Sequence, residues 1–195
     1  MMRRMQRFAV PLVILGLSAC APGAEEGACW TTSTPEQLAD RPSPLDSAMV
    51  TLGDAQAKVC YGRPSARERQ VMGGLVQYGE PWRFGANEAT AIHLPFPAEI
   101  GGVAVQPGAY SLYAIPGTEE WTVVVNGNAE RWGIPVDGEV TARDLGSFVV
   151  VPEALDAPVE TLTVDFQATG PDQADLVAEW ALTRIRIPVR RVAEG

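Results

Sequence analysis

The feature that most constrains the fold of this chain is a series of short runs rich in β-branched and aromatic residues, each bounded by Gly, Pro, Asn or Asp. This spacing is typical of an all-β sandwich or barrel, and no segment has the period of a long amphipathic helix. We therefore predict an all-β fold, a single antiparallel β-sandwich of the jelly-roll-like kind. The runs expected to form strands are 58–61, 90–96, 108–115, 120–126, 147–151, 160–167 and 174–189.

Two neighbouring runs have the pattern of a hairpin. Residues 108–115 and 120–126 are separated by a short connection that contains Pro116 and Gly117, so an antiparallel pair is expected. In residues 160–167, Leu162, Val164 and Phe166 alternate with polar residues. This alternation predicts one face on the core and one face towards solvent.

The last run contains a change of register. From Leu176 to Leu182 the apolar residues occupy even positions, whereas from Ile185 to Val189 they occupy odd positions. The apolar face therefore changes side near Thr183. A β-bulge, or a strand that crosses from one sheet to the other, would produce this change.

The N-terminus has the pattern of an export signal. Basic residues precede the run F-A-V-P-L-V-I-L-G-L, which is too short to span a bilayer as a permanent helix. The small residues before Cys20, in L-S-A-C, resemble a bacterial lipobox, so we expect 1–19 to be a lipoprotein signal peptide and Cys20 to carry acyl chains such as palmitate. A plain secretory signal is the alternative. Acylation predicts a protein of the cell envelope, anchored at the outer membrane or another periplasmic face.

The segment after this signal is rich in Pro and Gly and lacks a sustained period, so we expect residues 20–44 to be a flexible tether. Residues 45–195 are long enough for one domain with one core. Removal of the signal would take away Arg3, Arg4 and Arg7 and change the net charge from −9 to −9 − 3 = −12. So acidic a protein is not expected to bind nucleic acid.

Several classes of chemistry are disfavoured by composition. His93 is the only histidine, which excludes a Ser-His-Asp triad or a multi-histidine metal site within one chain, and its neighbours suggest a strand position near a sheet edge. The only lysine is Lys58. We expect neither a metal nor another cofactor.

Cys29 and Cys60 lie outside the cytoplasm in this interpretation, and the sequence leaves open whether they form a disulfide or remain free thiols. The methionines Met49 and Met72 and all the tryptophans are expected to pack in the core or at its boundary.

The stretch W-R-F-G-A-N-E-A-T, residues 82–90, concentrates polar and aromatic groups. In a structural interpretation, Trp82 fills the core, Arg83 pairs with Glu88 or with carbonyls of a neighbouring loop, and Asn87 closes a turn. We consider this interpretation the stronger one.

In the alternative interpretation, this stretch contributes to a pocket for a small anionic or hydroxylated ligand. Glu88 is then a weak candidate for a general acid or base. The sequence contains no second carboxylate at a diagnostic spacing, no G-x-S-x-G and no Gly-rich phosphate loop, so an enzyme is the less favoured hypothesis. The residues expected to line such a pocket are Arg63, Arg83, Asn87, Glu88, Thr90, Tyr110 and Tyr113.

Three stretches together match a family pattern. They are Y-G-R-P-S-A-R-E-R at 61–69, G-G-L-V-Q-Y-G-E-P-W-R-F-G-A-N-E-A-T at 73–90 and P-G-A-Y-S-L-Y-A-I-P-G-T-E-E-W-T-V-V-V-N at 107–126. On these motifs the chain resembles the bacterial family catalogued as domain of unknown function 2911, over nearly the whole domain. The resemblance implies an exported protein, often a lipoprotein, but no activity, because the function of the family is not established.

The chain departs from the family pattern at three positions. Glu68 stands where the family usually has Gly, Gln77 where it has Pro, and Pro81 where it often has an aliphatic residue. Because Gly adopts positive φ without steric cost, its replacement by Glu68 predicts a different shape for the loop that carries Arg67 and Arg69.

Together these patterns predict an envelope lipoprotein whose β-sandwich binds a small ligand or a partner protein. The alternatives are a purely structural envelope domain and an enzyme that uses Glu88 with Arg83 and Arg63.

Overall fold

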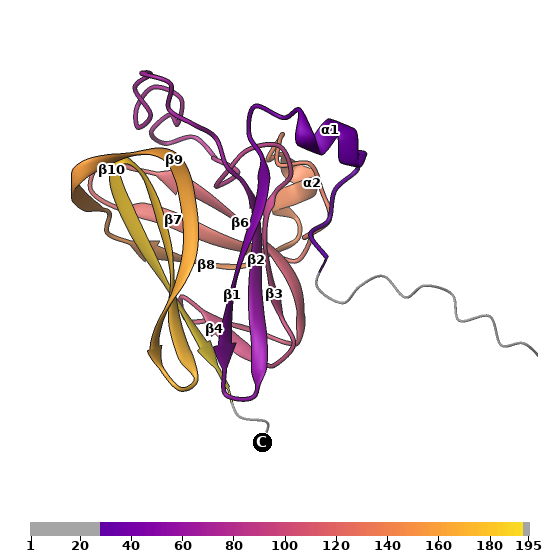
Figure 1. The fold of residues 1–195 in the computed structure, drawn as a ribbon. Coiled ribbons are helices and arrows are strands. Elements are labelled where there is room, and N and C mark those ends of the chain that lie inside the picture. Colours follow the sequence, from indigo (N-terminus) through magenta and orange to yellow (C-terminus); the bar gives the residue numbers. More distant parts are fainter. Residues whose placement is uncertain (1–27, 193–195) are drawn as a thin grey trace, which may run out of the picture.

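The computed structural model describes residues 28–192, which form two antiparallel β-sheets packed face to face (Figure 1). The predicted antiparallel β-sandwich is therefore confirmed. The expected signal peptide and Cys20 lie outside the described residues.

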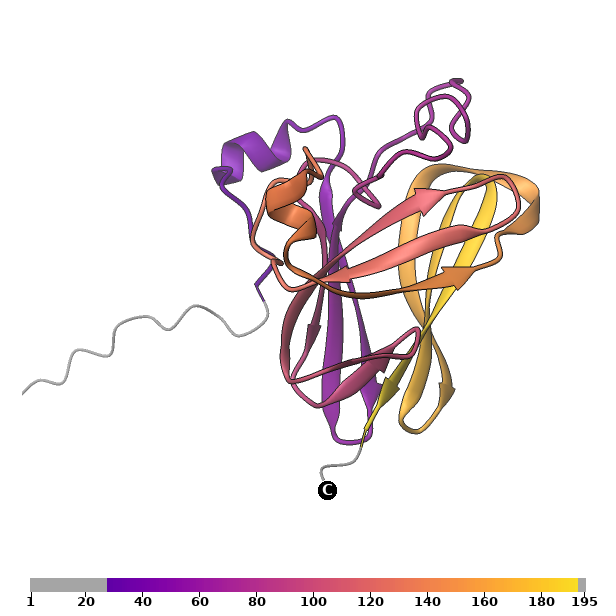
Figure 2. The same cartoon turned by 180° about the vertical axis from the view of Figure 1, so that it is seen from behind.

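The larger sheet has six strands, and most of its neighbours are consecutive in sequence. Its order is β1 (Leu45–Leu52), β2 (Ala55–Gly62), β3 (Thr90–Leu94), β6 (Gly108–Pro116), β7 (Trp121–Asn126) and β8 (Asp144–Val150). The smaller sheet has the order β5 (Val103–Val105), β4 (Ala98–Ile100), β10 (Gln173–Arg191) and β9 (Glu153–Gly170). Two short helices, α1 (Pro35–Ala39) and α2 (Gly138–Thr141), lie at the same end of the sandwich as the connection between β2 and β3, at the top of Figures 1 and 2.

The core lies between the sheets and follows the alternation of the strands. On β7, Trp121, Val123 and Val125 are buried in the core, and on β9, Leu162 and Val164 meet them from the other sheet. Burial of such apolar surface contributes about 25 cal/mol per Å² and is the main stabilising term. β6 and β7 pair in register from Ser111↔Asn126 to Pro116↔Trp121, which confirms the predicted hairpin.

The outer face of the larger sheet is also covered, which the sequence did not predict. Ser111 of β6 and Asn126 of β7 point away from the core but are fully buried. The residues after β7 cover them, because Arg131 donates hydrogen bonds from its guanidinium to the carbonyls of Trp132 and Gly133 and to the Ser111 hydroxyl. Both faces of the central strands are therefore buried.

The predicted change of side in the last strand is confirmed as a bulge. Ala181 has a positive φ of 51°, and the pairing of β10 with β9 shifts register on both sides of it. Trp180 before the bulge and Ile185 after it both face the core, whereas Leu182 is exposed, contrary to the parity expected for it. β10 belongs to the smaller sheet over its whole length, so the alternative prediction, a strand that crosses from one sheet to the other, is wrong.

Residues 28–44 are ordered, so the predicted flexible tether is wrong for this part of 20–44. α1 begins with a capping box, in which the Thr34 hydroxyl accepts from the Gln37 backbone and the Gln37 side chain accepts from the Thr34 N–H. Pro35 occupies the first helical turn, where a missing N–H has no cost. Residues 20–27 lie outside the described residues.

The N-terminal segment is also held covalently. Cys29 and Cys60 form a disulfide with an S–S distance of 2.03 Å and a Cα–Cα distance of 5.6 Å, so the first of the two alternatives for these cysteines is confirmed. Cys60 lies on β2 and points to the outer face of the larger sheet, since Val59 and Tyr61 face the core. The disulfide therefore fixes the segment against this face.

Some sequence predictions were wrong in detail. β1, β4 and β5 were not predicted as strands, and Met49 and Trp132 are exposed rather than packed. His93 lies on β3, an internal strand between β2 and β6, and not near a sheet edge. Glu68 has a φ of 60°, in the left-handed region that glycine favours.

Candidate functional site

The stretch 82–90 forms a tight corner that leads into β3. Phe84 and Asn87 both have positive φ, 59° and 63°, which lets the chain reverse direction within a few residues. The corner packs on the end of β2, where the Ala86 N–H donates to the Gly62 carbonyl at 3.2 Å. A Cβ at Gly62 would lie 2.0 Å from the Ala86 oxygen, so only glycine allows this approach.

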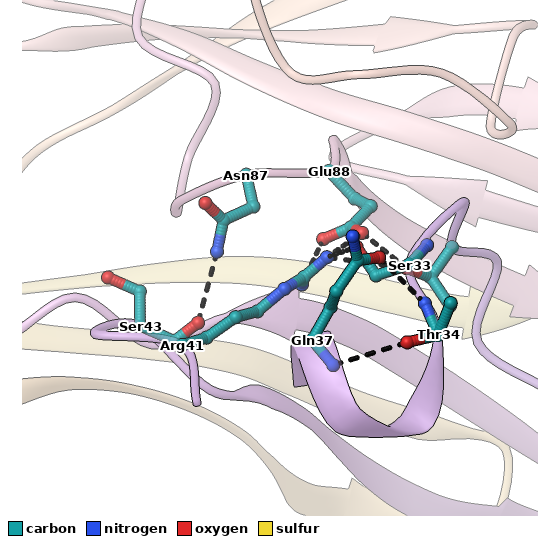
Figure 3. Close-up of polar contacts among 8 residues, drawn as sticks. Ser33, Thr34, Gln37, Arg41, Ser43, Asn87 and Glu88 are labelled. Atoms are coloured by element: carbon teal, nitrogen blue, oxygen red, sulfur yellow. Dashed lines mark hydrogen bonds and ion pairs between the residues drawn. The ribbon is translucent and has the colours of Figure 1, made fainter. Parts of the chain in front are cut away.

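Glu88 is bound by Arg41 of the N-terminal segment (Figure 3), and Arg83 is not its partner. The Arg41 guanidinium donates to both carboxylate oxygens, at 2.6 and 2.8 Å, and the Thr31 hydroxyl donates to one of them at 2.6 Å. Glu88 is only 2% exposed. The predicted pairing of Arg83 with Glu88 is therefore wrong, because a closer arginine on a segment taken for a tether occupies the carboxylate.

Two effects act on the pKa of Glu88 in opposite directions. Burial is the largest single influence and raises the pKa, but hydrogen bonds from Arg41 and Thr31, and the charge of Arg41, together outweigh it. The pKa of Glu88 is therefore lower than usual, and the side chain is a carboxylate already saturated by protein donors. This arrangement suits a structural ion pair better than a general acid or base.

The side chains of Asn87 and Thr90 donate hydrogen bonds that stabilise the corner. The Asn87 amide donates to the Ser43 carbonyl at 3.0 Å, which ties the corner to the chain just before β1 (Figure 3). The Thr90 hydroxyl donates to the Phe84 carbonyl at 2.8 Å. Both side chains therefore have partners within the protein, and that of Asn87 is a distant backbone group and not its own turn.

The other predicted pocket residues do not meet at one place. Arg63 donates to Asp46 at 3.0 Å and to the Leu162 carbonyl. Tyr110 and Tyr113 are on opposite faces of β6, because their positions differ by an odd number. Tyr110 donates to the Gln106 carbonyl and Tyr113 donates to Asp144, and burial together with Asp144 raises the pKa of Tyr113.

A cleft of about 370 Å³ opens beside the corner. Among the residues predicted for a ligand pocket, Arg83 is the one that lines it. The charged lining residues are Arg69 and Arg83, and no acidic residue is among them. The remaining lining residues are Ser43, Pro64, Leu75, Val76, Pro81, Trp82, Gly85, Ala86, Ile134 and Trp180.

The arginines in this cleft lack counter-ions. The Arg83 Nε–H donates to the Gly85 carbonyl at 3.2 Å, and within residues 28–192 its two terminal nitrogens have no hydrogen-bond or ion-pair partner. Arg83 is half-buried, and burial lowers the pKa of its guanidinium. Arg69 donates to the carbonyls of Ser65 and Ala66, again without a carboxylate partner in the described part of the chain.

Neighbouring groups fix the shape of the cleft. The Arg83 side chain lies against Gly133, where a Cβ would be 2.4 Å from the Arg83 Cδ. The Trp82 ring stacks on Trp180, with centroids 6.1 Å apart and planes 21° apart, and meets Trp121 edge-on. The cleft therefore combines free guanidinium donors with an aromatic wall held in place by packing.

Sequence reasoning missed Arg41, Arg69, Ile134 and Trp180 as contributors to this region. The T-P-E-Q capping pattern at 34–37 was the one signal of order in the segment that carries Arg41. Nothing in the sequence indicated that Ile134 and Trp180 lie beside Arg83.

Within residues 28–192, no helix has the length and apolarity needed to cross a membrane. In the same range, no group of three or more His, Cys, Asp or Glu side chains is arranged to hold a metal ion.

The fold is an all-β sandwich domain with a cleft whose charged lining residues are Arg69 and Arg83. The family model described as a protein of unknown function, DUF2911, matches residues 43–189, and this chain belongs to that family. The family assignment expected from the motifs is confirmed. Searches of curated proteins and of solved structures found no match.

Proposed function

We propose that this protein is an exported, lipid-anchored protein of the cell envelope whose β-sandwich binds a small anionic ligand in the cleft beside Arg83. The observation that carries the binding proposal is the half-buried Arg83, whose terminal nitrogens have no partner among residues 28–192. A cation that is partly removed from water without a partner costs free energy, and an incoming anion would offset that cost.

The composition of the cleft supports an anion over a cation. The whole chain has a net charge of −9, yet both charged residues of the cleft are arginines. The planar guanidinium has donors in the geometry that carboxylate and phosphate groups accept. The volume of about 370 Å³ falls within the range of roughly 300–1,000 Å³ of small-molecule sites.

The walls of the cleft indicate the rest of the ligand. Trp82, Trp180, Leu75 and Ile134 supply apolar and aromatic surface next to the arginines. A carboxylate or phosphate ester with an apolar or aromatic part would match both kinds of surface. We propose binding instead of catalysis, because Glu88 is saturated by Arg41 and Thr31 and does not line the cleft.

The anchoring part of the proposal is supported by the basic and apolar N-terminus followed by L-S-A-C. The described residues begin at Ala28, eight positions after Cys20. Eight residues span at most about 28 Å, which would hold the domain close to the membrane surface.

A thermal-shift screen with matched pairs of compounds tests the binding proposal. Each pair consists of a small carboxylic acid and its amide, or a phosphate ester and its parent alcohol, so that size and apolar surface stay constant. We expect the anion of at least one pair to raise the unfolding temperature. At a hundredfold excess over the dissociation constant the gain is about 2.7 kcal/mol, or roughly 5–10 °C for a domain of this size. Equal shifts for the charged and neutral members of every pair, or no shift at all, would contradict the proposal.

A further inference from the structure

A second groove, of about 450 Å³, lies next to the Arg83 cleft, and Arg69 lines both. Its walls come from the loop after β2 and from the part of β9 and β10 around the bulge at Ala181. The bulge leaves Leu182 exposed, and its side chain lines this groove. Other apolar residues of the second groove are Val71, Met72 and Val159. The groove therefore has apolar surface within reach of the proposed anion site.

A narrow cavity of about 10 Å³ lies between the cleft and the second groove. Trp82 and Trp180 line both this cavity and the cleft. Met72 and Thr183 line both this cavity and the second groove. A cavity of this size barely holds one water molecule, and a water needs two to four polar partners, whereas Thr183 is the one residue of these walls with a polar side chain other than a tryptophan. The two grooves are therefore joined through apolar space.

The loop 70–78 covers this joining cavity and is attached to the sandwich at its two ends. The Ala66 N–H donates to the Glu160 carbonyl before the loop, and the Gly79 N–H donates to the Pro116 carbonyl after it. In the described part of the chain, the backbone groups of 70–78 hydrogen-bond only to one another. Figures 1 and 2 show the connection between β2 and β3, which contains this loop, at the end of the sandwich.

Packing of side chains holds the middle of the loop. Val71 and Val76 belong to the hydrophobic core, whereas Met72 is half-buried. Methionine is unbranched and adapts its shape to its surroundings. Movement of Met72 widens the passage to the second groove without breaking a backbone hydrogen bond between the loop and either sheet.

We infer that the anion bound beside Arg83 is the head group of a single-chain amphiphile, whose unbranched aliphatic chain runs under the loop 70–78 into the second groove. This inference rests on the anion site proposed above. The charges set the direction of the ligand, because the cleft has arginines and no acidic residue, whereas Glu68 and Glu160 line the second groove and disfavour an anion there. The head group is a carboxylate or a phosphate, and the neutral chain contacts Leu182.

Binding of straight-chain acids of increasing length to the full chain in lipid nanodiscs tests the inference. Acetate, hexanoate, decanoate and tetradecanoate share one head group, and the corresponding alkyl phosphates form a second series that distinguishes the two head groups. Tryptophan fluorescence follows each titration, since Trp82 and Trp180 line the path of the chain. The affinity of the wild type should rise roughly three- to fourfold for each methylene that is buried, and it should level off once the second groove is filled.

A charge placed in the second groove should remove the gain from the chain. Leu182→Glu should bind hexanoate as the wild type does, but tetradecanoate roughly tenfold or more weakly, because Leu182 lines the second groove and not the cleft. Val149→Glu is the matched control, because Val149 is 55% exposed and Leu182 is 54% exposed, but Val149 lies on β8 and lines neither groove. It should bind both acids as the wild type does. Partition of the acids into the nanodisc lipid is the same for all three proteins and cancels in the comparison.

The failure of this inference differs from the failure of the anion site. Equal affinity of the wild type for short and long acids, or equal affinity of Leu182→Glu and Val149→Glu for tetradecanoate, would overturn the placement of the chain and leave the anion site standing. If no acid binds more tightly than the alcohol of the same chain length, the anion site itself is wrong, and the inference falls with it.

Discussion

The carboxylate of Glu88 lies 2.6 Å from the guanidinium of Arg41, a residue 47 positions earlier in the chain. The two side chains are almost completely buried, with 3% of Glu88 and 9% of Arg41 exposed. This ion pair and the Cys29–Cys60 disulfide fasten the N-terminal segment to the sandwich at two points. The N-terminal segment therefore fixes the corner at residues 82–90 through Glu88. Arg83 lines the cleft, and its terminal nitrogens have no partner among residues 28–192.

The first prediction concerns the energy of this ion pair. Removal of one partner leaves a buried charge uncompensated, so Arg41→Ala and Glu88→Ala should each lower the free energy of unfolding by roughly 3–5 kcal/mol. The double variant should lose much less than the sum, because both partners are then absent. Denaturant unfolding of the four proteins measures the coupling. The same cycle with Arg83→Ala and Glu88→Ala should be additive, and strong coupling there would contradict the assignment of partners.

The second prediction is a pH dependence. The pKa of Glu88 in the folded protein is lower than its usual value of 4.5, so the carboxylate stabilises the fold above that pH. The contribution should be lost as the pH falls through the lowered folded-state pKa. The difference in free energy of unfolding between wild type and Glu88→Gln should therefore be largest near neutral pH and shrink below about pH 4.5. Urea unfolding at several pH values measures it, and a difference that stays constant down to pH 3 would argue against an ionised, paired Glu88.

The third prediction concerns the disulfide. Cys29 and Cys60 are 31 positions apart. Closing a loop of that length lowers the entropy of the unfolded chain, which raises the free energy of unfolding by roughly 3–4 kcal/mol. The Cys29→Ala/Cys60→Ala variant should be less stable than the oxidised wild type by about that amount. It should match the reduced wild type, which is the control for effects of the substitutions themselves. Equal stability of the oxidised and reduced proteins would show that the covalent link contributes nothing.

The fourth prediction concerns anchoring. Cys20→Ser should abolish membrane association and leave the domain folded, because the described fold begins after this residue. Cell fractionation and metabolic labelling with a fatty acid measure the first effect, and far-ultraviolet circular dichroism measures the second. Incorporation of fatty acid that persists in Cys20→Ser would show that Cys20 is not the acylated residue.

The fold was more predictable than the site, for physical reasons. The strand β9 has one face on the core, so Leu162, Val164 and Phe166 alternate with polar residues and can be recognised. β4 and β5 have three residues each, which is too short for a period to be seen. The buried outer face of β6 depends on Arg131, which reaches it from a loop with no periodic pattern.

The partners within the site depend on contacts between distant segments. The sequence of residues 82–90 was enough to predict a turn at Asn87, since its positive φ follows from local backbone chemistry, but not the hydrogen bond from its side chain to the distant Ser43 carbonyl. It could not indicate that Arg41 satisfies Glu88, because Arg83 is much closer in sequence and chemically equivalent. The consequence bears on function, because Arg83 donates only to the Gly85 carbonyl and its terminal nitrogens have no partner among residues 28–192.

The most direct test of the account is a titration of the anion identified by thermal shift, followed by tryptophan fluorescence, since Trp82 and Trp180 line the cleft. The measurement compares wild type with Arg83→Met, which keeps much of the side-chain length but removes the charge. Arg190→Met is the control for loss of one positive charge, because Arg190 is exposed and does not line this cleft. Loss of charge-assisted hydrogen bonds of about 1.5–3 kcal/mol predicts a dissociation constant roughly 10- to 100-fold higher for Arg83→Met, with little change for Arg190→Met. Equal affinity of wild type and Arg83→Met would contradict the proposal that Arg83 binds the anion.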